Sequence, residues 1–232
     1  MKRITMTVFS LVFALALNAQ DFSVKSTKQA VAPEIPKAVL IDQSPDGTLT
    51  NFESIVSVVN NTGAGVYVTD DFTLDSEFNI QSVTAYGFNS DQSFLSTVTG
   101  VNVYVYADSG STPAGDPSQP GTGLLELVDI DPFGPAVEII SSGDGGFDLK
   151  VDIEGASGGS FTLPAGDYWL VVAPTQNIPD FGNATRWNWR AAGSGVFGNS
   201  VAHLIDPTNA FGVQSVKFPP NALVGSIVLL TL

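Results

Sequence analysis

The sequence predicts an all-β fold, a two-sheet antiparallel β-sandwich of the jelly-roll type. From Ser54 onward, short runs of β-branched and aromatic residues alternate with clusters of Gly, Pro, Asn, Asp and Ser. The runs recur every ten to twenty residues or so, without the amphipathic helices that parallel βαβ units require. Apolar residues make up 44% of the chain and charged residues 14%, which is ample for a packed core. About ten strands are expected, with a closed barrel as the alternative.

The clearest predicted strand begins at Val101, where valines at every second position through Val105 alternate with Asn102, Tyr104 and Tyr106. Successive side chains of a strand point to opposite faces, so the valines are expected on one face and the larger polar-tipped groups on the other. The other predicted strands are residues 55–59, 66–74, 80–88, 124–128, 147–153, 160–163, 168–173, 185–190 and 226–232.

Two segments precede the predicted domain. Residues 1–19 have the composition of a signal peptide, because two basic residues precede a ten-residue apolar run and Ala19 is small enough for signal peptidase. Residues 20–50 contain three prolines and no sustained periodicity, which indicates a flexible leader. We expect residues 51–232 to form a single β-sandwich domain that is secreted or held at the cell surface.

Charge and cysteine content exclude several function classes. Without residues 1–19 the chain has seven Lys and Arg against 23 Asp and Glu, a formal charge of −16 that disfavours nucleic acid and anionic lipid as partners. The absence of cysteine excludes disulfides, thiol catalysis and cysteine-based zinc sites. No later segment has the eighteen or so apolar residues of a membrane helix, so no membrane insertion of the mature chain is expected.

The longest interruption of the strand pattern is the segment 107–123, which contains Pro113, Pro117 and Pro120. Proline has no amide hydrogen to give to a sheet, so the segment is predicted to be a surface loop. A loop of this length in a compact domain is either a binding element or a tolerated decoration. The sequence leaves both interpretations open.

Several strings of the chain carry a family resemblance. DDFTL at residues 70–74, IQSVTAYGF at 80–88, VNVYVYADSGSTPAGDPSQPGTGLLEL at 101–127 and LPAGDYWLVVAP at 163–174 resemble β-sandwich modules of secreted bacterial surface proteins. Such adhesin-like modules often accompany a C-terminal sorting domain, whereas this chain ends at Leu232 on an apolar stretch. The resemblance implies a sandwich fold and a surface location, and it brings no functional residues with it.

Catalytic signals are weak. The G-x-S-x-G string at residues 155–159 precedes a strand-like stretch instead of a helix, and the G-x-G-x-x-G string at 193–198 lacks the helix and the acid of a dinucleotide site. His203, the single histidine, lies among apolar residues, which favours a structural over a catalytic role. Glycosidases need only two carboxylates, so a pair such as Glu126 and Glu138 stays open.

A tryptophan pair gives the candidate ligand site. In a strand, Trp187 and Trp189 project to one face while Arg186, Asn188 and Arg190 project to the other. Exposed, the two indoles would form a platform that stacks on sugar rings, with the arginines beside it. Buried, they would fill the interior of the sandwich, and this alternative carries more weight.

Acidic residues give the candidate metal sites. Calcium takes six to eight oxygen ligands, so Asp70 with Asp71, or Asp129 with Asp131 beside a turn, are the predicted donors. The acids in residues 148–154 alternate with apolar positions and therefore indicate a solvated sheet face. Calcium is the one cofactor that the composition suggests.

Three functions are compatible with these features. The first is a non-catalytic extracellular module in adhesion or glycan binding, whose partners are glycans or other surface proteins. The second is a secreted carbohydrate-active enzyme that uses a carboxylate pair. The third is a structural surface or matrix subunit that associates through strand edges.

Overall fold

A computed structural model provides the structure of the chain. It describes residues 38–45, 51–53, 55–57, 65–143, 145–179, 185–192, 202–209, 216–217, 224–225 and 227–231. All of them belong to one compact unit, Ile35–Leu232. The predicted signal peptide at residues 1–19 lies outside the described residues.

The regular secondary structure of the described part consists almost entirely of strands. They are β1 (Ala38–Asp42), β2 (Asn51–Glu53), β3 (Ile55–Ser57), β4 (Gly65–Leu74), β5 (Phe78–Ala85), β6 (Gly87–Phe88), β7 (Val98–Ala107), β8 (Leu125–Ile130), β9 (Val137–Ser141), β10 (Phe147–Asp152), β11 (Phe161–Leu163), β12 (Gly166–Gln176), β13 (Asn188–Ala192), β14 (Ala202–Ile205), β15 (Val216–Lys217), β16 (Val224–Gly225) and β17 (Ile227–Thr231). The helices are single turns, α1 (Phe94–Thr97) and α2 (Ile153–Ser157), and no helix of the described part is long and apolar enough to cross a membrane.

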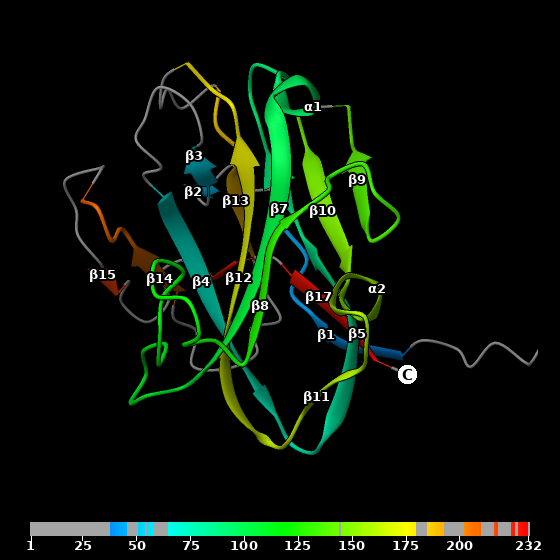
Figure 1. Ribbon diagram of the computed structural model, residues 1–232, viewed down its shortest axis with the longest axis vertical. Coiled ribbons are helices and arrows are strands. Elements are labelled where there is room, and N and C mark those ends of the chain that lie inside the picture. Colours follow the sequence, from blue (N-terminus) through cyan, green and yellow to red (C-terminus); the bar gives the residue numbers. More distant parts are fainter. Residues whose placement is uncertain are drawn as a thin grey trace, which may run out of the picture. The chain divides into compact units, whose positions relative to one another are not determined.

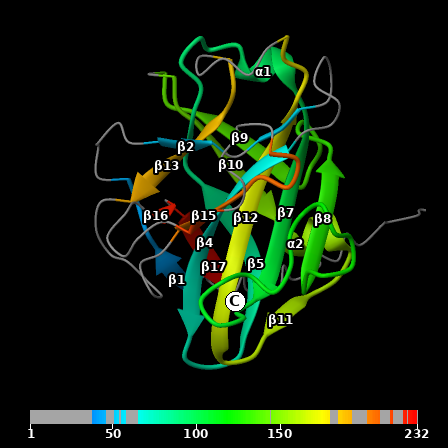
Figure 2. The ribbon, with the colours of Figure 1, turned by 90° about the vertical axis from the view of Figure 1, so that its left-hand side faces the viewer.

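The strands form two large sheets and a small one (Figure 1). The seven-stranded sheet has the order β15-β14-β4-β3-β12-β7-β8, and the six-stranded sheet has the order β1-β17-β5-β10-β9 with β11 beside β5. In Figure 2 the strands β12, β7 and β8 lie in front of β5, β10 and β9. The third sheet joins β16, β13, β2 and β6. The predicted all-β sandwich is confirmed, with two additions: the third sheet and a parallel pairing of β3 with β12.

A single apolar core fills the space between the two large sheets. The predicted alternation along β7 is confirmed, because Val101, Val103 and Val105 are buried in this core. Leu149 and Val151 of β10 reach the same core from the six-stranded sheet, which joins the two layers. All ten predicted strands overlap a strand of the structure, because the alternation of apolar and polar residues is a local signal.

The prediction of a flexible leader at residues 20–50 is wrong for residues 38–42, which form β1, whereas residues 20–37 and 46–50 lie outside the described residues. Strand β1 pairs with β17 at the other end of the chain, and Ile41 is 2% exposed in the core. Gln43 follows β1 and donates from Nε2 to Asp70 Oδ2 at 2.8 Å. The local pattern gave no sign of this strand, because its partner lies almost two hundred residues away in the sequence.

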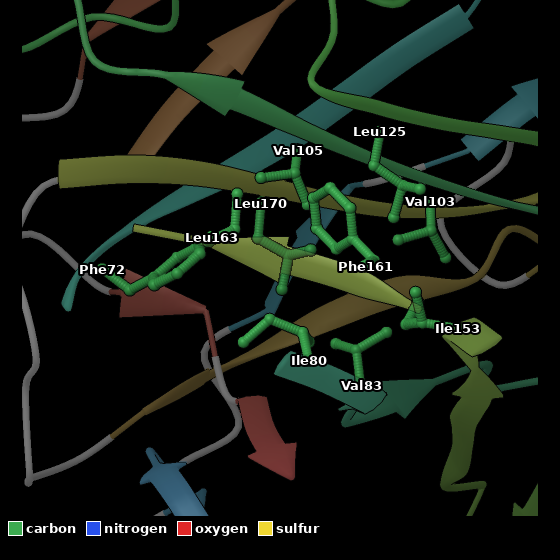
Figure 3. Close-up of a pocket in the computed structure, with 10 residues that line it drawn as sticks. All are labelled: Phe72, Ile80, Val83, Val103, Val105, Leu125, Ile153, Phe161, Leu163 and Leu170. Atoms are coloured by element: carbon green, nitrogen blue, oxygen red, sulfur yellow. The ribbon is translucent and has the colours of Figure 1, made fainter. Parts of the chain in front are cut away.

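The close-up in Figure 3 shows how tightly the core is filled. Ten apolar side chains, from both large sheets and from α2, point toward one another around a gap of about 10 Å³. They are Phe72, Ile80, Val83, Val103, Val105, Leu125, Ile153, Phe161, Leu163 and Leu170. A gap of this size, with no polar group in its lining, is a packing defect and no ligand site.

Replacing Leu149 by alanine should lower the free energy of unfolding by about 2–5 kcal/mol, because it leaves a cavity in the shared core. Leu124→Ala is the matched control: this side chain is 51% exposed, and its loss should cost no more than about 0.5 kcal/mol. Urea denaturation of both variants measures the difference. Equal losses would contradict the assignment of the core.

Candidate functional site

The outer face of the seven-stranded sheet carries large aromatic side chains instead of small polar ones. Along β7 and β12 the pairing sets Tyr106 opposite Trp169 and Tyr104 opposite Val171. These residues alternate with the core positions, so they point away from the sandwich interior. They belong to a second buried cluster, which we call the tyrosine face: Tyr67, Tyr104, Tyr106, Trp169, Val171, Ala173 and Ile205.

The rings of this face contact one another in regular geometries. Tyr104 and Tyr106 are stacked with centroids 6.1 Å apart, and Tyr67 meets Tyr104 edge-on at 6.4 Å. On the other side, His203 of β14 lies edge-on to Trp169 at 6.3 Å. Such arrangements are the favoured ones for aromatic quadrupoles, so the layer is well packed.

The predicted surface loop that follows β7 folds over this face. The indole Nε1 of Trp169 donates to Asp108 Oδ1 at 2.8 Å. A Cβ on Gly115 would lie only 3.1 Å from Cδ1 of Tyr106, so the loop backbone rests directly on that ring. In Figure 2 the loop, in green, crosses in front of the lower part of β12. The loop is therefore an ordered cover of the tyrosine face.

Glu126 of β8 fastens the far end of the loop. Its carboxylate accepts hydrogen bonds from the backbone N–H of Gly121 at 2.8 Å and of Gly123 at 2.7 Å. These bonds stabilise the ionised form and hold the pKa of Glu126 below its usual range, first through Gly121 and then through Gly123. The anchor is a charge-assisted one, which is stronger than a neutral hydrogen bond.

The phenols of this face stay protonated at neutral pH. Burial raises the pKa of Tyr104 to about 12, and the negative charges of Asp129 and Glu126 add to the effect. Burial raises the pKa of Tyr67 and Tyr106 further still. A protonated phenol both donates and accepts, so the face presents neutral hydroxyl groups on aromatic rings.

Two hydroxyl groups of this face have unmet hydrogen-bonding capacity. Tyr106 is 0% exposed, and its hydroxyl has no hydrogen-bond partner among the described residues. The same holds for Oγ1 of Thr69, which lies opposite Val171 in the β4–β12 ladder. Buried polar groups are nearly always paired with protein, water or ligand, so these two hydroxyls are exceptions that need an explanation.

The predicted tryptophan platform is wrong. Trp187 and Trp189 are both 0% exposed and belong to the main core, as the alternative interpretation had it. Trp187 donates from Nε1 to the carbonyl of Phe147 at 2.7 Å, and its backbone N–H donates to Gln176 Oε1 at 2.7 Å. A Cβ on Gly87 would come within 1.9 Å of the same Nε1, so this glycine is required for the indole to fit.

The two arginines predicted beside that platform serve elsewhere. Arg186 is 5% exposed, and burial lowers the pKa of its guanidinium to about 10. The Arg190 guanidinium lies over the ring of Phe88, 5.6 Å from its centroid. Neither arginine borders a sugar-stacking surface, because the indoles between them point into the core.

The predicted metal pairs are not assembled. Asp70 and Asp71 are consecutive on β4, so their side chains lie on opposite faces of the sheet and cannot share one cation. Asp129 Oδ1 accepts from Thr175 Oγ1 at 2.9 Å, whereas Asp131 Oδ1 accepts from the N–H of Phe133 in the following turn. No group of three acidic or histidine side chains suited to a metal occurs in the described part of the chain.

The carboxylate pair and the G-x-S-x-G string that the sequence suggested do not form catalytic sites in the structure. Glu126 projects from the seven-stranded sheet, whereas Glu138 lies on β9 of the six-stranded sheet and pairs with Lys150 at 2.7 Å, so the two do not form a carboxylate pair. The G-x-S-x-G string is the end of α2, where Ser157 donates to the Gly159 carbonyl at 2.6 Å. The string at residues 193–198 lies outside the described residues.

The sequence predicted that these rings share one face of a strand, but it did not predict that the loop covers them. The alternation around Tyr104 and Tyr106 predicted a polar-tipped face, and the loop from residue 107 was named as a possible binding element. Nothing in the local pattern indicated that the loop covers the rings. Models of known families give no match to the chain, and curated proteins give none either.

Replacing Glu126 by glutamine should weaken the attachment of the loop to β8, because the neutral amide no longer attracts the N–H groups of Gly121 and Gly123 with a full charge. Amide hydrogen exchange at these glycines should become about tenfold faster. Glu138→Gln removes the same charge on the other sheet and should leave the loop unchanged.

In the wild type, the protection of the Gly121 and Gly123 amides should depend on pH in one direction. A carboxyl whose pKa is lowered by folding stabilises the folded loop fully above its ordinary pKa of 4.5, and this contribution is lost as the pH falls through the lowered value. Protection of the two glycine amides should therefore fall in acid in the wild type and stay flat in Glu126→Gln. An identical acid profile in both proteins would refute the anchor.

Proposed function

We propose that the chain is an exported, non-catalytic β-sandwich module that binds a glycan at the tyrosine face. The observation that carries the proposal is that two buried hydroxyls on this side of the sheet, those of Tyr106 and of Thr69, have no hydrogen-bond partner among the described residues. Tyr106 belongs to the layer of aromatic rings, and Thr69 lies opposite Val171 of the same layer. Sugars are recognised by such a combination, because their C–H faces stack on rings while their hydroxyls exchange hydrogen bonds with neutral polar groups.

Further features support a binding role over a catalytic one. Each of Asp108, Glu126 and Asp129 accepts a hydrogen bond from a side chain or backbone of its surroundings, and so serves to fix the loop and the sheet edge. The acids around the face are thus structural in character. The basic-then-apolar start of the sequence supports export, which would bring the module into contact with extracellular glycans.

The loop after β7 controls access in this proposal. Tyr67 is 7% exposed and Tyr104 is 5% exposed, so a sugar reaches the rings only when the cover shifts. The loop is joined to the face through polar groups such as Asp108 and Glu126, and water can replace these contacts at moderate cost. A ligand that supplies hydroxyls to Tyr106 would compensate for the opening.

The Tyr106→Phe variant tests this proposal. Removing a buried hydroxyl that has no partner in the described part of the chain should leave the melting temperature of the ligand-free protein unchanged or higher. If that hydroxyl contacts the glycan, binding should weaken about five- to tenfold. Residues 20–232 would first be screened on a glycan array, and the affinity of a retained glycan would then be measured by titration calorimetry.

Tyr168→Phe is the matched control, because its hydroxyl donates to the Pro164 carbonyl at 2.8 Å and its ring belongs to the main core. This variant should lose about 1 kcal/mol of stability and bind glycan as the wild type does. Three outcomes contradict the proposal: no glycan is retained, Tyr106→Phe binds like the wild type, or the retained glycan is shortened, which would indicate an enzyme.

A further inference from the structure

A β-bulge sets one carboxylate at the edge of the seven-stranded sheet. Strand β8 lies beside β7 at the end of this sheet (Figure 2). Its register on β7 shifts by one residue between Leu127 and Ile130, so Val128 and Asp129 together stand opposite Asn102. At Asp129 φ is +52°, a left-handed conformation that few residues other than glycine adopt. Bulges of this kind turn a side chain into a direction that a regular strand does not offer.

Two buried side chains hold Asp129 in this conformation. Its N–H donates to Asn102 Oδ1 at 2.9 Å, and its Oδ1 accepts from Thr175 Oγ1 at 2.9 Å. Asn102 Nδ2 in turn donates to Thr175 Oγ1 at 3.0 Å, so the three residues form a closed hydrogen-bonded ring. A Cβ on Gly100 would lie 2.8 Å from Asp129 Oδ1, so the ring also depends on that glycine. The carboxylate is therefore preorganised.

This ring lies on the same side of the sheet as the tyrosine face. Asn102 precedes Tyr104 by two residues on β7, and Thr175 follows Ala173 by two residues on β12, so these side chains share a face. Burial does most to raise the pKa of Tyr104, and the negative charge of Asp129 is the next largest cause. The carboxylate is thus within electrostatic reach of the rings.

Asp129 differs from the rings in its exposure. The residue is exposed, whereas Tyr104 and Tyr67 are buried, so a ligand reaches the carboxylate before the loop shifts. Oδ1 is held by Thr175, and Oδ2 accepts no hydrogen bond from the described residues. Asp129 therefore fixes the sheet edge with one oxygen and offers the other to a ligand.

The chemistry of a fixed carboxylate selects among sugars. An ionised carboxylate accepts hydrogen bonds from hydroxyl groups, and such charge-assisted bonds are stronger than neutral ones. A sugar that carries its own carboxylate or sulfate brings a second negative charge to the same place and is repelled. One group thus attracts neutral sugars and rejects anionic ones.

We propose that Asp129 is the specificity-determining residue of the tyrosine face, where it accepts hydroxyl groups of a neutral sugar and excludes anionic glycans. The inference rests on the glycan binding proposed above and names the class of glycan. Asn102 and Thr175 act as positioning residues, because they hold the carboxylate and are themselves buried.

The experiment is a calorimetric titration of the full chain, at constant ionic strength, with three pairs of oligosaccharides of equal length. Each pair joins a neutral sugar to its uronic acid: glucose with glucuronate, galactose with galacturonate, and mannose with mannuronate. The wild type should bind the neutral member of at least one pair, and should bind it at least tenfold more tightly than the anionic member.

Two substitutions of Asp129 test its role. Asp129→Asn keeps the size of the side chain, an oxygen for Thr175 and a residue that tolerates the left-handed conformation. It should bind the neutral sugar about five- to tenfold more weakly, and its preference over the anionic sugar should fall below threefold. Asp129→Gly keeps the bulge, since glycine adopts positive φ readily, and should weaken binding at least as much.

Asp131→Asn is the charge-matched control, because its carboxylate lies two residues further on and accepts from the N–H of Phe133 in the turn. It should keep both the affinity and the preference of the wild type. The inference alone is overturned if neutral sugars bind but Asp129→Asn and Asp129→Gly behave as the wild type does, if the wild type prefers an anionic member, or if Asp131→Asn loses as much. If no oligosaccharide binds at 10 mM, the proposed function itself fails, and this inference fails with it.

Discussion

Strands β7 and β12 are buried on both faces, and the rest of the structure depends on this constraint. They pair antiparallel along their length, from Tyr168 opposite Ala107 to Gln176 opposite Val98. Their inner side chains enter the core between the sheets, as Val103 and Leu170 do. Their outer side chains are mostly aromatic and aliphatic, and exposing them to water is unfavourable, so a second layer is needed on the outside.

The segment after β7 supplies much of that second layer. A loop rich in glycine and proline has little apolar surface of its own, so it is held by polar contacts to the sheet that it covers. Asp108 receives the indole N–H of Trp169, and Glu126 receives two backbone N–H groups of the loop. The acidic composition of the chain thus has a structural use, because carboxylates fix loops by accepting several bonds at once.

The proposed glycan site is built around buried hydroxyls that the described residues leave without a hydrogen-bond partner, those of Tyr106 and Thr69. Their neighbours on this side of the sheet are mostly neutral rings and aliphatic side chains. Such surroundings favour a neutral polyhydroxylated ligand over a charged one.

The sequence predicted which residues share a face of a strand better than it predicted what covers that face. Alternation around Val101 placed the valines and tyrosines on the correct opposite faces, because that pattern is a property of a single strand. The tryptophan pair failed for the complementary reason: Trp187 and Trp189 do share a side, but an isolated strand does not show whether that side meets water or a second sheet. Asp70 and Asp71 failed because adjacency in sequence separates side chains in a strand.

The sequence by itself determined the all-β class, most of the strands and which residues share a face, since these follow from a two-residue period within a few positions. Only the tertiary structure decided which faces are covered and by what. Strand β1 is held by β17 from the opposite end of the chain, and Gln81 faces an α2 turn more than seventy residues away. Burial is the sum of such distant contacts, and no local pattern encodes it.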